Sequence, residues 1–409
     1  MNEGANGYTL ALLVVSAVIL LSIAIRRLFA MARVPAMVGF IVLGIGIGAV
    51  LETGVFGAER ARSTIEVLGQ IGIITLLFRV GLESNLTALY EKLGQAMFVW
   101  LGNVVLSAGL VFVIAYDWLG FRLLPALFMS AAMSATSIGV ATAVWRDCGA
   151  LESEPGALML DVAELDDISA VLIMSVLFAV AATFGGAQSG AVTWTILREI
   201  VQLMILLPVF VLGCFLFGRY LEQPLRRWFH RIEPRTGTVL FAAGAAILIG
   251  ALADFAGFSV AVGALFAGLA FSVDPARPRL DRAFGELDAL FSPFFFVAIG
   301  AAVSLGTVSD SLLPALIVLV AAVVGKIAGA GLPVLSFDTP YTAMLIGLSM
   351  VPRAEIALII MSYGRNLGDW AVPKESFDIV VIVTIATAIL GPVGMVALLN
   401  RRDPEKKVR

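Results

Sequence analysis

The sequence contains few of the charged residues that a soluble protein needs on its surface. Charged side chains account for 14% of its 409 residues, whereas hydrophobic ones account for 60% and the mean hydropathy is +0.99. A soluble domain carries about 25% charged residues, so this chain lacks the polar groups to cover its surface in water. The composition therefore predicts a membrane protein surrounded by the lipid bilayer, and we expect no nucleic-acid partner.

Cysteine and histidine are scarce as well. Cys148 and Cys214 lie far apart and outside any CxxC or metal-ligand spacing, so we interpret both as packing or loop thiols. His230 is the sole histidine and lies in a basic loop, where it could sense cytoplasmic pH, although a surface histidine is usually idle. The start MNEGANGYTL lacks the basic region and cleavage site of a secretory signal. We therefore expect the first apolar segment to be retained.

Long hydrophobic runs, by contrast, are abundant. A membrane-spanning helix needs about 20 apolar residues, and this length divides the chain into about thirteen segments. They run roughly over 7–26, 31–51, 64–83, 93–116, 122–146, 155–183, 194–218, 237–254, 257–273, 286–305, 311–333, 340–364 and 376–399. We therefore expect an all-α polytopic membrane protein.

The basic residues give the orientation of these segments. Of the 27 lysines and arginines, 18 fall in the C-terminal tail or in loops after odd-numbered segments, and 6 fall on the opposite side. The other three, Arg79, Lys326 and Arg353, lie at membrane depth. Because cytoplasmic loops collect basic residues, the sequence predicts an external N-terminus and a cytoplasmic C-terminus, most simply in a bacterial inner membrane.

Three pairs of segments resemble each other and indicate an internal repeat. AMVGFIVLGIGIG matches VAVGALFAGLAFS in its glycine spacing, Gly39 to Gly44 against Gly263 to Gly268. LLFRVGLESNL likewise matches FFVAIGAAVSL, and MSAAMSATSIGVA matches LIGLSMVPRAEIA as a polar interruption in apolar sequence. Each pair is seven segments apart, an odd number, so the two halves are expected to be inverted relative to each other.

The third of these pairs is expected to consist of broken helices. Pro352 removes a backbone donor in the middle of its segment, and Arg353 and Glu355 follow at once. The matching segment has polar or flexible residues at the same depth, namely Ser134, Thr136, Ser137 and Gly139. Two crossing breaks would leave helix ends that need compensation, for which Glu355 and Lys326 are candidates. The alternative is a simple kink at Pro352.

Paired carboxylates mark the expected ion site. Asp161, Glu164, Asp166 and Asp167 lie in the otherwise apolar stretch ALMLDVAELDDISAVLIMSVLFAV. A carboxylate at membrane depth costs at least a few kcal/mol, so it is found where it meets a cation, a proton or a fixed partner. We expect Asp166 and Asp167 to border one cavity and to titrate as a coupled set. Asp161 and Glu164 are interpreted either as a vestibule for cations or as a solvated helix end.

Six segments in order resemble those of the monovalent cation:proton antiporter-2 family, which includes bacterial sodium/proton antiporters and the Kef-type potassium systems. They are VPAMVGFIVLGIGIG (34–48), LGQIGIITLLFRVGLESNL (68–86), SAAMSATSIGVATAV (130–144), AELDDISAV (163–171), SPFFFVAIGAAVSL (292–305) and MVPRAEIALII (350–360). The two-aspartate form of the motif at Asp166 and Asp167 is associated with sodium antiporters that move net charge, and Lys326 falls where such members carry a lysine. Arg79 departs from the family pattern, and we expect it to snorkel or to pair with Glu83.

The resemblance also implies the organisation of the chain. It implies one antiporter membrane domain over 1–409, with two discontinuous crossed helices and no C-terminal regulatory domain. A dimerisation part is expected at about 1–86 and 237–305, a core ion-translocating part at about 93–183 and 311–399, and a linking helix at about 194–218. The chain is accordingly expected to form a homodimer.

The predicted function is the exchange of a monovalent cation, Na+ or Li+, for protons by alternating access. We assign Asp167 as the shared ion and proton carrier and Asp166 as the partner of Lys326. Oxygen atoms at Thr136 and Ser137 are expected to complete the cation shell, because sodium favours oxygen ligands. Arg353 and Glu355 are expected to be a charge-compensating pair at the break rather than ion ligands.

Other functions remain open at this point. The alternatives are a sodium-coupled symporter of a small organic solute and a K+/H+ antiporter, with a channel as a further class. An intramembrane aspartyl protease needs aspartates on separate helices, whereas Asp166 and Asp167 are neighbours. We therefore expect no enzymatic activity and no cofactor, the only small ligands being the transported cation and the proton.

Overall fold

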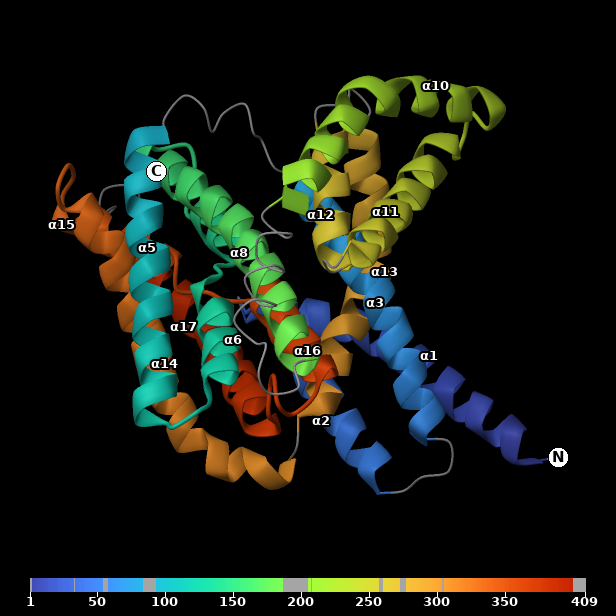
Figure 1. The fold of residues 1–409 in the computed structure, drawn as a ribbon, viewed down its shortest axis with the longest axis horizontal. Helices are drawn as coiled ribbons and strands as arrows, with labels where there is room; N and C mark the ends of the chain where they lie inside the picture. Colours follow the sequence, from blue (N-terminus) through green and yellow to red (C-terminus); the bar gives the residue numbers. More distant parts are fainter. Residues whose placement is uncertain are drawn as a thin grey trace. The chain divides into compact units, whose positions relative to one another are not determined.

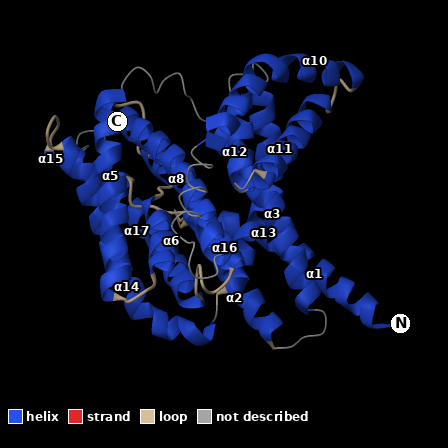
Figure 2. Cartoon of the chain, viewed as in Figure 1, coloured by secondary structure: helices blue, strands red, loops and turns tan. Residues whose placement is uncertain are grey.

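A computed structural model describes residues 2–32, 34–53, 58–83, 93–186, 205–206, 208–256, 260–272, 277–303 and 305–399. This described part consists of helices and the loops that join them, with no strand (Figures 1 and 2). Eight of its helical spans are long and apolar enough to cross a membrane by length and composition. The predicted all-helical membrane fold is therefore confirmed.

The helices follow the expected segments closely. Their bounds are α1 (Asn2–Met31), α2 (Ala36–Glu52), α3 (Ala58–Glu83), α5 (Leu93–Val113), α6 (Leu123–Ser134), α7 (Ile138–Asp147), α8 (Glu154–Gly186), α10 (Glu222–Ile232), α11 (Gly237–Phe255), α12 (Val260–Phe271), α13 (Arg277–Ala302), α14 (Leu305–Val334), α15 (Pro340–Ser349), α16 (Glu355–Leu367) and α17 (Lys374–Leu399). Two π-helical turns, η1 (Ile114–Trp118) and η2 (Phe217–Leu221), extend α5 and precede α10. Of the expected linking helix at 194–218, residues 194–204 and 207 lie outside the described residues.

The chain divides into two compact units. Unit 1 comprises Met1–Ile25, Phe40–Asn85 and Ser175–Ala302, and unit 2 comprises Arg26–Gly39, Leu86–Met174 and Val303–Arg409. Within unit 2, α5 packs along α14, and α15 and α17 also pack against α14 (Figure 1). The paired aspartates of α8 and the two interrupted segments all belong to unit 2.

Both predicted helix breaks are present. The chain leaves the helical conformation after Ser134 and resumes it at Ile138, with Ala135 and Ser137 in extended conformations. The second break separates Ser349 from Glu355 and contains Pro352. Pro352 therefore lies in a true interruption rather than in a kinked helix, because the residues on either side of it do not continue the helical ladder.

One helix was not expected from the sequence. We interpreted the segment RYLEQPLRRWFHRIEPR as a basic interfacial loop, whereas α10 occupies Glu222–Ile232. Its apolar residues Leu225, Phe229 and Ile232 recur at helical spacing, but the many charges between them hide this pattern. His230 is exposed on this helix.

Arg79 forms ion pairs with two aspartates of α13. Its guanidinium lies 3.2 Å from Asp281 Oδ1 and 3.5 Å from Asp288 Oδ2, both on α13. The side chain of Glu83 lies outside the described residues, so the expected pair of Arg79 with Glu83 stays a prediction. The sequence could not reveal these partners, because they lie some 200 positions along the chain and only the packing of α3 against α13 brings them together.

Glycines permit two matching close approaches between helices of unit 1. A β-carbon at Gly81 of α3 would overlap the carbonyl oxygen of Leu265 and lie 3.1 Å from the α-carbon of Gly268 on α12. Gly300 of α13 meets α2 in the same way, because a β-carbon at Gly300 would lie 2.9 Å from the α-carbon of Gly44. Small residues at such contacts let helix backbones pack closely in a membrane. The contacts join Gly81 to Gly268 and Gly300 to Gly44, and the sequence repeat relates Gly44 to Gly268 and Gly81 to Gly300, so the two contacts correspond to each other.

We predict that Gly268→Ala destabilises the protein and that Gly46→Ala does not. The added methyl group at Gly268 meets the backbone of Phe78, which forces α3 and α12 apart at a cost of about 1–3 kcal/mol. Gly46 is exposed on α2 and has open space around it, so alanine there improves helix propensity by up to about 1 kcal/mol. Thermal unfolding of the purified variants in detergent measures both effects. Equal melting temperatures for the two variants would contradict the close approach.

Candidate ion-translocation site

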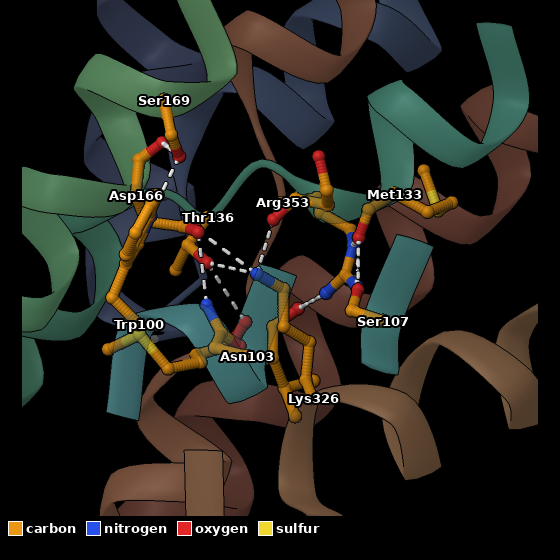
Figure 3. A network of polar contacts seen from close by, with 12 residues as sticks. Trp100, Asn103, Ser107, Met133, Thr136, Asp166, Ser169, Lys326 and Arg353 are labelled. Carbon is orange, nitrogen blue, oxygen red and sulfur yellow. Dashed lines mark hydrogen bonds and ion pairs between the residues drawn. The ribbon is translucent and has the colours of Figure 1, made fainter. Parts of the chain in front are cut away.

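The broken end of α6 exposes backbone carbonyl groups inside unit 2, and Arg353 binds one of them. Its Nε and Nη2 atoms donate to the Met133 carbonyl oxygen at 3.1 and 2.6 Å (Figure 3). The same guanidinium donates to the carbonyl oxygens of Val351 at 2.5 Å and Ala322 at 3.3 Å. Arg353 is fully buried. A helix C-terminus carries partial negative charge and carbonyl groups without helical partners, so the arginine compensates both.

Lys326 of α14 binds the last residue of the same helix end. Its ammonium group donates to the Ser134 carbonyl oxygen in a short hydrogen bond and to Thr136 Oγ1 at 2.8 Å. It also forms an ion pair with Asp166 Oδ2 at 3.1 Å, and both side chains are fully buried. Lys326 therefore uses its three donors on three different partners.

Asp166 of α8 has partners on both carboxylate oxygens. Oδ2 forms the ion pair with Lys326, and Oδ1 accepts a hydrogen bond from Nδ2 of Asn103 on α5 at 3.0 Å (Figure 3). The Asp166 backbone carbonyl accepts a further bond from Ser169 Oγ at 2.9 Å. Because these contacts hold the carboxylate from two sides, Asp166 is a fixed member of the network in this arrangement.

Asp167 differs from its neighbour. Its Oδ1 atom is buried and has no hydrogen-bond partner among the described residues. Successive helical residues point about 100° apart, so Asp167 does not share the direction in which Asp166 meets Lys326. A buried carboxylate oxygen without a donor is costly unless a proton or a cation occupies it.

The two helix breaks cross each other. The Ser137 amide donates to the Pro352 carbonyl oxygen at 2.9 Å, and Thr136 Oγ1 donates to the Met350 carbonyl oxygen at 3.3 Å. Glu355 begins α16, where a carboxylate suits the positive end of the helix, and accepts from Ser137 Oγ at 3.4 Å. The hydroxyl groups of Thr136 and Ser137 thus take part in hydrogen bonds across the crossing.

One expected pair differs from the structure. We expected Arg353 to pair with Glu355, but among the described residues the contacts of Arg353 are the carbonyl oxygens above and Ser107 Oγ at 3.5 Å. The carbonyl groups at the end of α6 and in the second break offer the Arg353 guanidinium several hydrogen-bond acceptors in place of one carboxylate. Asp161 and Glu164 lie partly buried one turn before the pair. No cluster of three or more metal-binding side chains occurs in the described part of the chain.

Helix α5 contributes three polar side chains to the site that we did not predict from the sequence. Trp100, Asn103 and Ser107 lie on one face of this helix and bond, respectively, to Ser169 Oγ, Asp166 Oδ1 and the Met133 carbonyl oxygen. Their spacing of three and four residues in WLGNVVLS is that of a helical face and was available in the sequence. Isolated neutral polar residues in an apolar helix predict a functional site less strongly than charged residues do, because burying them costs less free energy.

We predict that Lys326→Gln lowers the melting temperature more than Asp167→Asn does. Removing the ammonium charge leaves Asp166 buried without its counter-ion and weakens the cap of α6, at a cost of about 3–5 kcal/mol. Asp167→Asn removes no described hydrogen bond from Asp167 Oδ1. The double variant Lys326→Gln/Asp166→Asn should lose less stability than the two single changes summed. Additive losses in this cycle would show that the two residues are not coupled.

The sequence is similar to a family of known proteins. The profile of the family described as "Sodium/hydrogen exchanger, transmembrane" matches residues 15–401. The chain is 27% identical over 365 residues to the high-affinity Na+/H+ antiporter NhaS3 of Synechocystis sp., which covers 87% of this chain and 76% of that protein. It is also 27% identical over 382 residues to the Na+/H+-K+ antiporter GerN of Bacillus cereus, covering 91% of this chain and 92% of that one.

The fold also resembles a solved structure. The sodium proton antiporter MjNhaP1 of Methanocaldococcus jannaschii superposes with a TM-score of 0.75 at 16% identity, over 97% of this chain and 99% of that one. The resemblance inferred from the motifs is thereby confirmed. Because the family profile spans nearly the whole sequence, the chain belongs to the sodium/hydrogen exchanger family.

Proposed function

We propose that this protein exchanges Na+ or Li+ for protons by alternating access and that Asp167 carries either the cation or the proton. The observation that carries this proposal is the contrast within the aspartate pair. Both oxygens of Asp166 have protein partners, whereas a buried oxygen of Asp167 has none in the described part of the chain. Asp167 is thus the carboxylate of the pair that is available to a ligand from solution.

The chemistry of one shared carboxylate explains exchange. A proton on Asp167 neutralises its charge and removes the site for a cation, and a bound cation repels the proton, so the two ligands exclude each other. A buried carboxylate is costly while it is charged, so the conformational change of alternating access is easiest when a proton or a cation neutralises Asp167. Asp166, Lys326, Arg353 and Glu355 then keep the crossing of the broken helices intact while the occupant of Asp167 changes.

The oxygen atoms at the site support a small monovalent cation such as Na+ or Li+ as the substrate. Carboxylate, hydroxyl and backbone carbonyl oxygens surround the crossing, and small hard cations favour such ligands. The name of the Bacillus cereus relative includes K+ as well as Na+, so K+/H+ exchange is the second candidate. The names of the relatives favour exchange over symport of an organic solute.

We further propose that unit 2 carries the ion and that unit 1 provides the interface of a homodimer. The network of Asp166, Lys326 and Arg353 lies wholly in unit 2, which supports the first assignment. The placement of basic residues supports an external N-terminus and a cytoplasmic C-terminus in an inner membrane. Cross-linking of single-cysteine variants in membranes tests both the dimer and the orientation.

We predict that Asp167→Asn abolishes cation-driven proton efflux although the protein still folds. The amide takes up no proton at physiological pH and carries no negative charge to balance a cation, so the exchange loses its carrier. Asp147→Asn, an exposed residue at the end of α7, is the matched control and should retain the wild-type rate. Proteoliposomes with a recorded internal pH give the measurement. Near-normal exchange by purified, folded Asp167→Asn would overturn the assignment.

We also predict competition between protons and the cation. Lowering the pH should raise the apparent KM for the cation by up to about tenfold per unit once the carrier is protonated, while saturating cation restores the maximal rate. The measurement is the transport rate at graded cation concentrations between about pH 6 and 9. A KM that stays flat over this range would contradict a shared site.

The two-aspartate motif leads to a separate prediction about the membrane potential. If two protons move for each cation, one net charge crosses and feels about 2.3 kcal/mol per 100 mV. A potassium gradient with valinomycin should therefore change the initial rate of exchange. A rate indifferent to the imposed potential would make the exchange electroneutral.

A further inference from the structure

Unit 1 contains an apolar groove that the proposed exchange does not use. It has a volume of about 780 Å³ and lies between residues 210–217, α10 and α11 (Figure 1). Glu233, directly after α10, is the one charged side chain among the described residues that line it. Ligand sites in proteins usually have volumes of about 300–1,000 Å³, so the groove is large enough to hold a hydrocarbon chain.

The lining of this groove leaves open space and exposes apolar side chains. A β-carbon at Gly213 or at Gly244 would meet no atom of the surrounding structure within 4 Å, and both glycines line the groove. The lining residues Ile232, Leu240 and Leu248 are 62%, 64% and 60% exposed. Exposed leucines are common on helices that face lipid, but these line a concave surface. A hydrocarbon chain in the groove would cover them without displacing protein atoms.

Helix α10 combines a wall of the groove with a concentration of positive charge. Its apolar residues Leu225 and Phe229 line the groove, and Trp228 beside them is exposed. Five arginines and two glutamates lie between positions 219 and 235, which gives this stretch a formal net charge of +3. Amphipathic helices with a basic polar face and an exposed tryptophan are typical of the membrane–water interface. The groove therefore opens beside a basic helix at the depth of lipid headgroups.

Two arginines of α10 carry charge that no protein carboxylate balances. Arg226 forms an ion pair with Glu222 at 3.2 Å, whereas Arg227 donates to the neutral side chain of Gln223 at 3.1 Å. In the described part of the chain, neither Arg227 nor Arg231 forms an ion pair, and both are exposed. They are four residues apart and so lie on the same face of the helix. Two neighbouring guanidinium groups suit a phosphate group, which accepts bidentate hydrogen bonds.

We propose that this groove binds an anionic phospholipid, with an acyl chain between α10 and α11 and the phosphate group at Arg227 and Arg231. The acyl chain matches the apolar lining, and a headgroup with net negative charge complements the positive charge of α10. A phospholipid joins these two parts in one molecule, as the groove and the basic helix are joined in unit 1. The inference goes beyond the proposed exchange and does not depend on it, because the binding requires no transported cation.

The first experiment tests the headgroup contact by native mass spectrometry of the delipidated full-length protein, titrated with phosphatidylglycerol or with phosphatidylcholine of the same acyl chains. The wild-type protein should bind phosphatidylglycerol more tightly. Arg227→Gln/Arg231→Gln should weaken that binding about 25-fold, because each basic residue near a lipid surface contributes about fivefold. The control Arg27→Gln/Arg146→Gln removes two exposed arginines outside the groove and should bind as the wild type does. Equal wild-type affinity for the two lipids, or an equal loss in the control, would overturn the proposal.

The second experiment fills the groove. Gly244→Trp places an indole ring in the open space and should weaken phosphatidylglycerol binding at least about tenfold, because the acyl chain loses its site. Gly46→Trp is the matched control, since Gly46 of α2 is also exposed with open space around it, and it should retain wild-type binding. If Gly244→Trp fails to fold, Gly213→Leu fills the same groove from the neighbouring helix and must show the same loss. Wild-type lipid binding in the folded groove variant would overturn the proposal.

The same variants distinguish a lipid from a second copy of the chain as the occupant of the groove. A lipid predicts that Gly244→Trp loses phosphatidylglycerol binding while its oligomeric state in lipid-free detergent equals that of the wild-type protein. Light scattering coupled to size-exclusion chromatography measures this state. A groove filled by a second copy predicts the reverse, a smaller dimer fraction in Gly244→Trp with the number of bound lipids unchanged. That result would overturn the proposal.

Discussion

The site depends on one constraint, which is that a helix interrupted inside a membrane must have its open ends compensated. The last turn of α6 leaves carbonyl groups that no helical donor can reach, and Arg353 and Lys326 bind those of Met133 and Ser134. These cations are fully buried, and the carbonyl groups and Asp166 hold them there. The break, the two basic residues and Asp166 therefore form one connected network, in which each member compensates the charge or the unpaired carbonyl groups of another.

The two carboxylates of the aspartate pair differ in their protein partners. Lys326 and Asn103 occupy Asp166 from opposite oxygens, so its charge is balanced by the protein itself. Asp167, one residue further along α8, has a buried oxygen to which no described residue donates. Two adjacent positions thereby differ: Asp166 is held by protein partners, and Asp167 is the residue that we propose as the carrier. A proton or a cation that neutralises the Asp167 carboxylate therefore breaks no hydrogen bond of that oxygen to the described protein.

The sequence predicted much of this arrangement because its strongest features are local. Runs of apolar residues gave the spans, Pro352 marked one break, and the charges Asp166, Asp167, Lys326 and Arg353 stood out against an apolar background. The partners were harder to predict, because each depends on how distant helices pack. Arg353 meets carbonyl groups rather than Glu355, and Arg79 meets α13. Asn103 escaped notice because a neutral amide in a helix gives a weak pattern until its neighbour is known.

The most direct test of the account is the release of protons when the cation binds to purified protein in weakly buffered detergent solution. Binding of Na+ or Li+ to the wild-type protein should release protons, because cation and proton share Asp167, and the release should disappear in Asp167→Asn while Asp147→Asn retains it. Equal proton release by the wild-type protein and by folded Asp167→Asn would contradict the claim that Asp167 is the shared carrier.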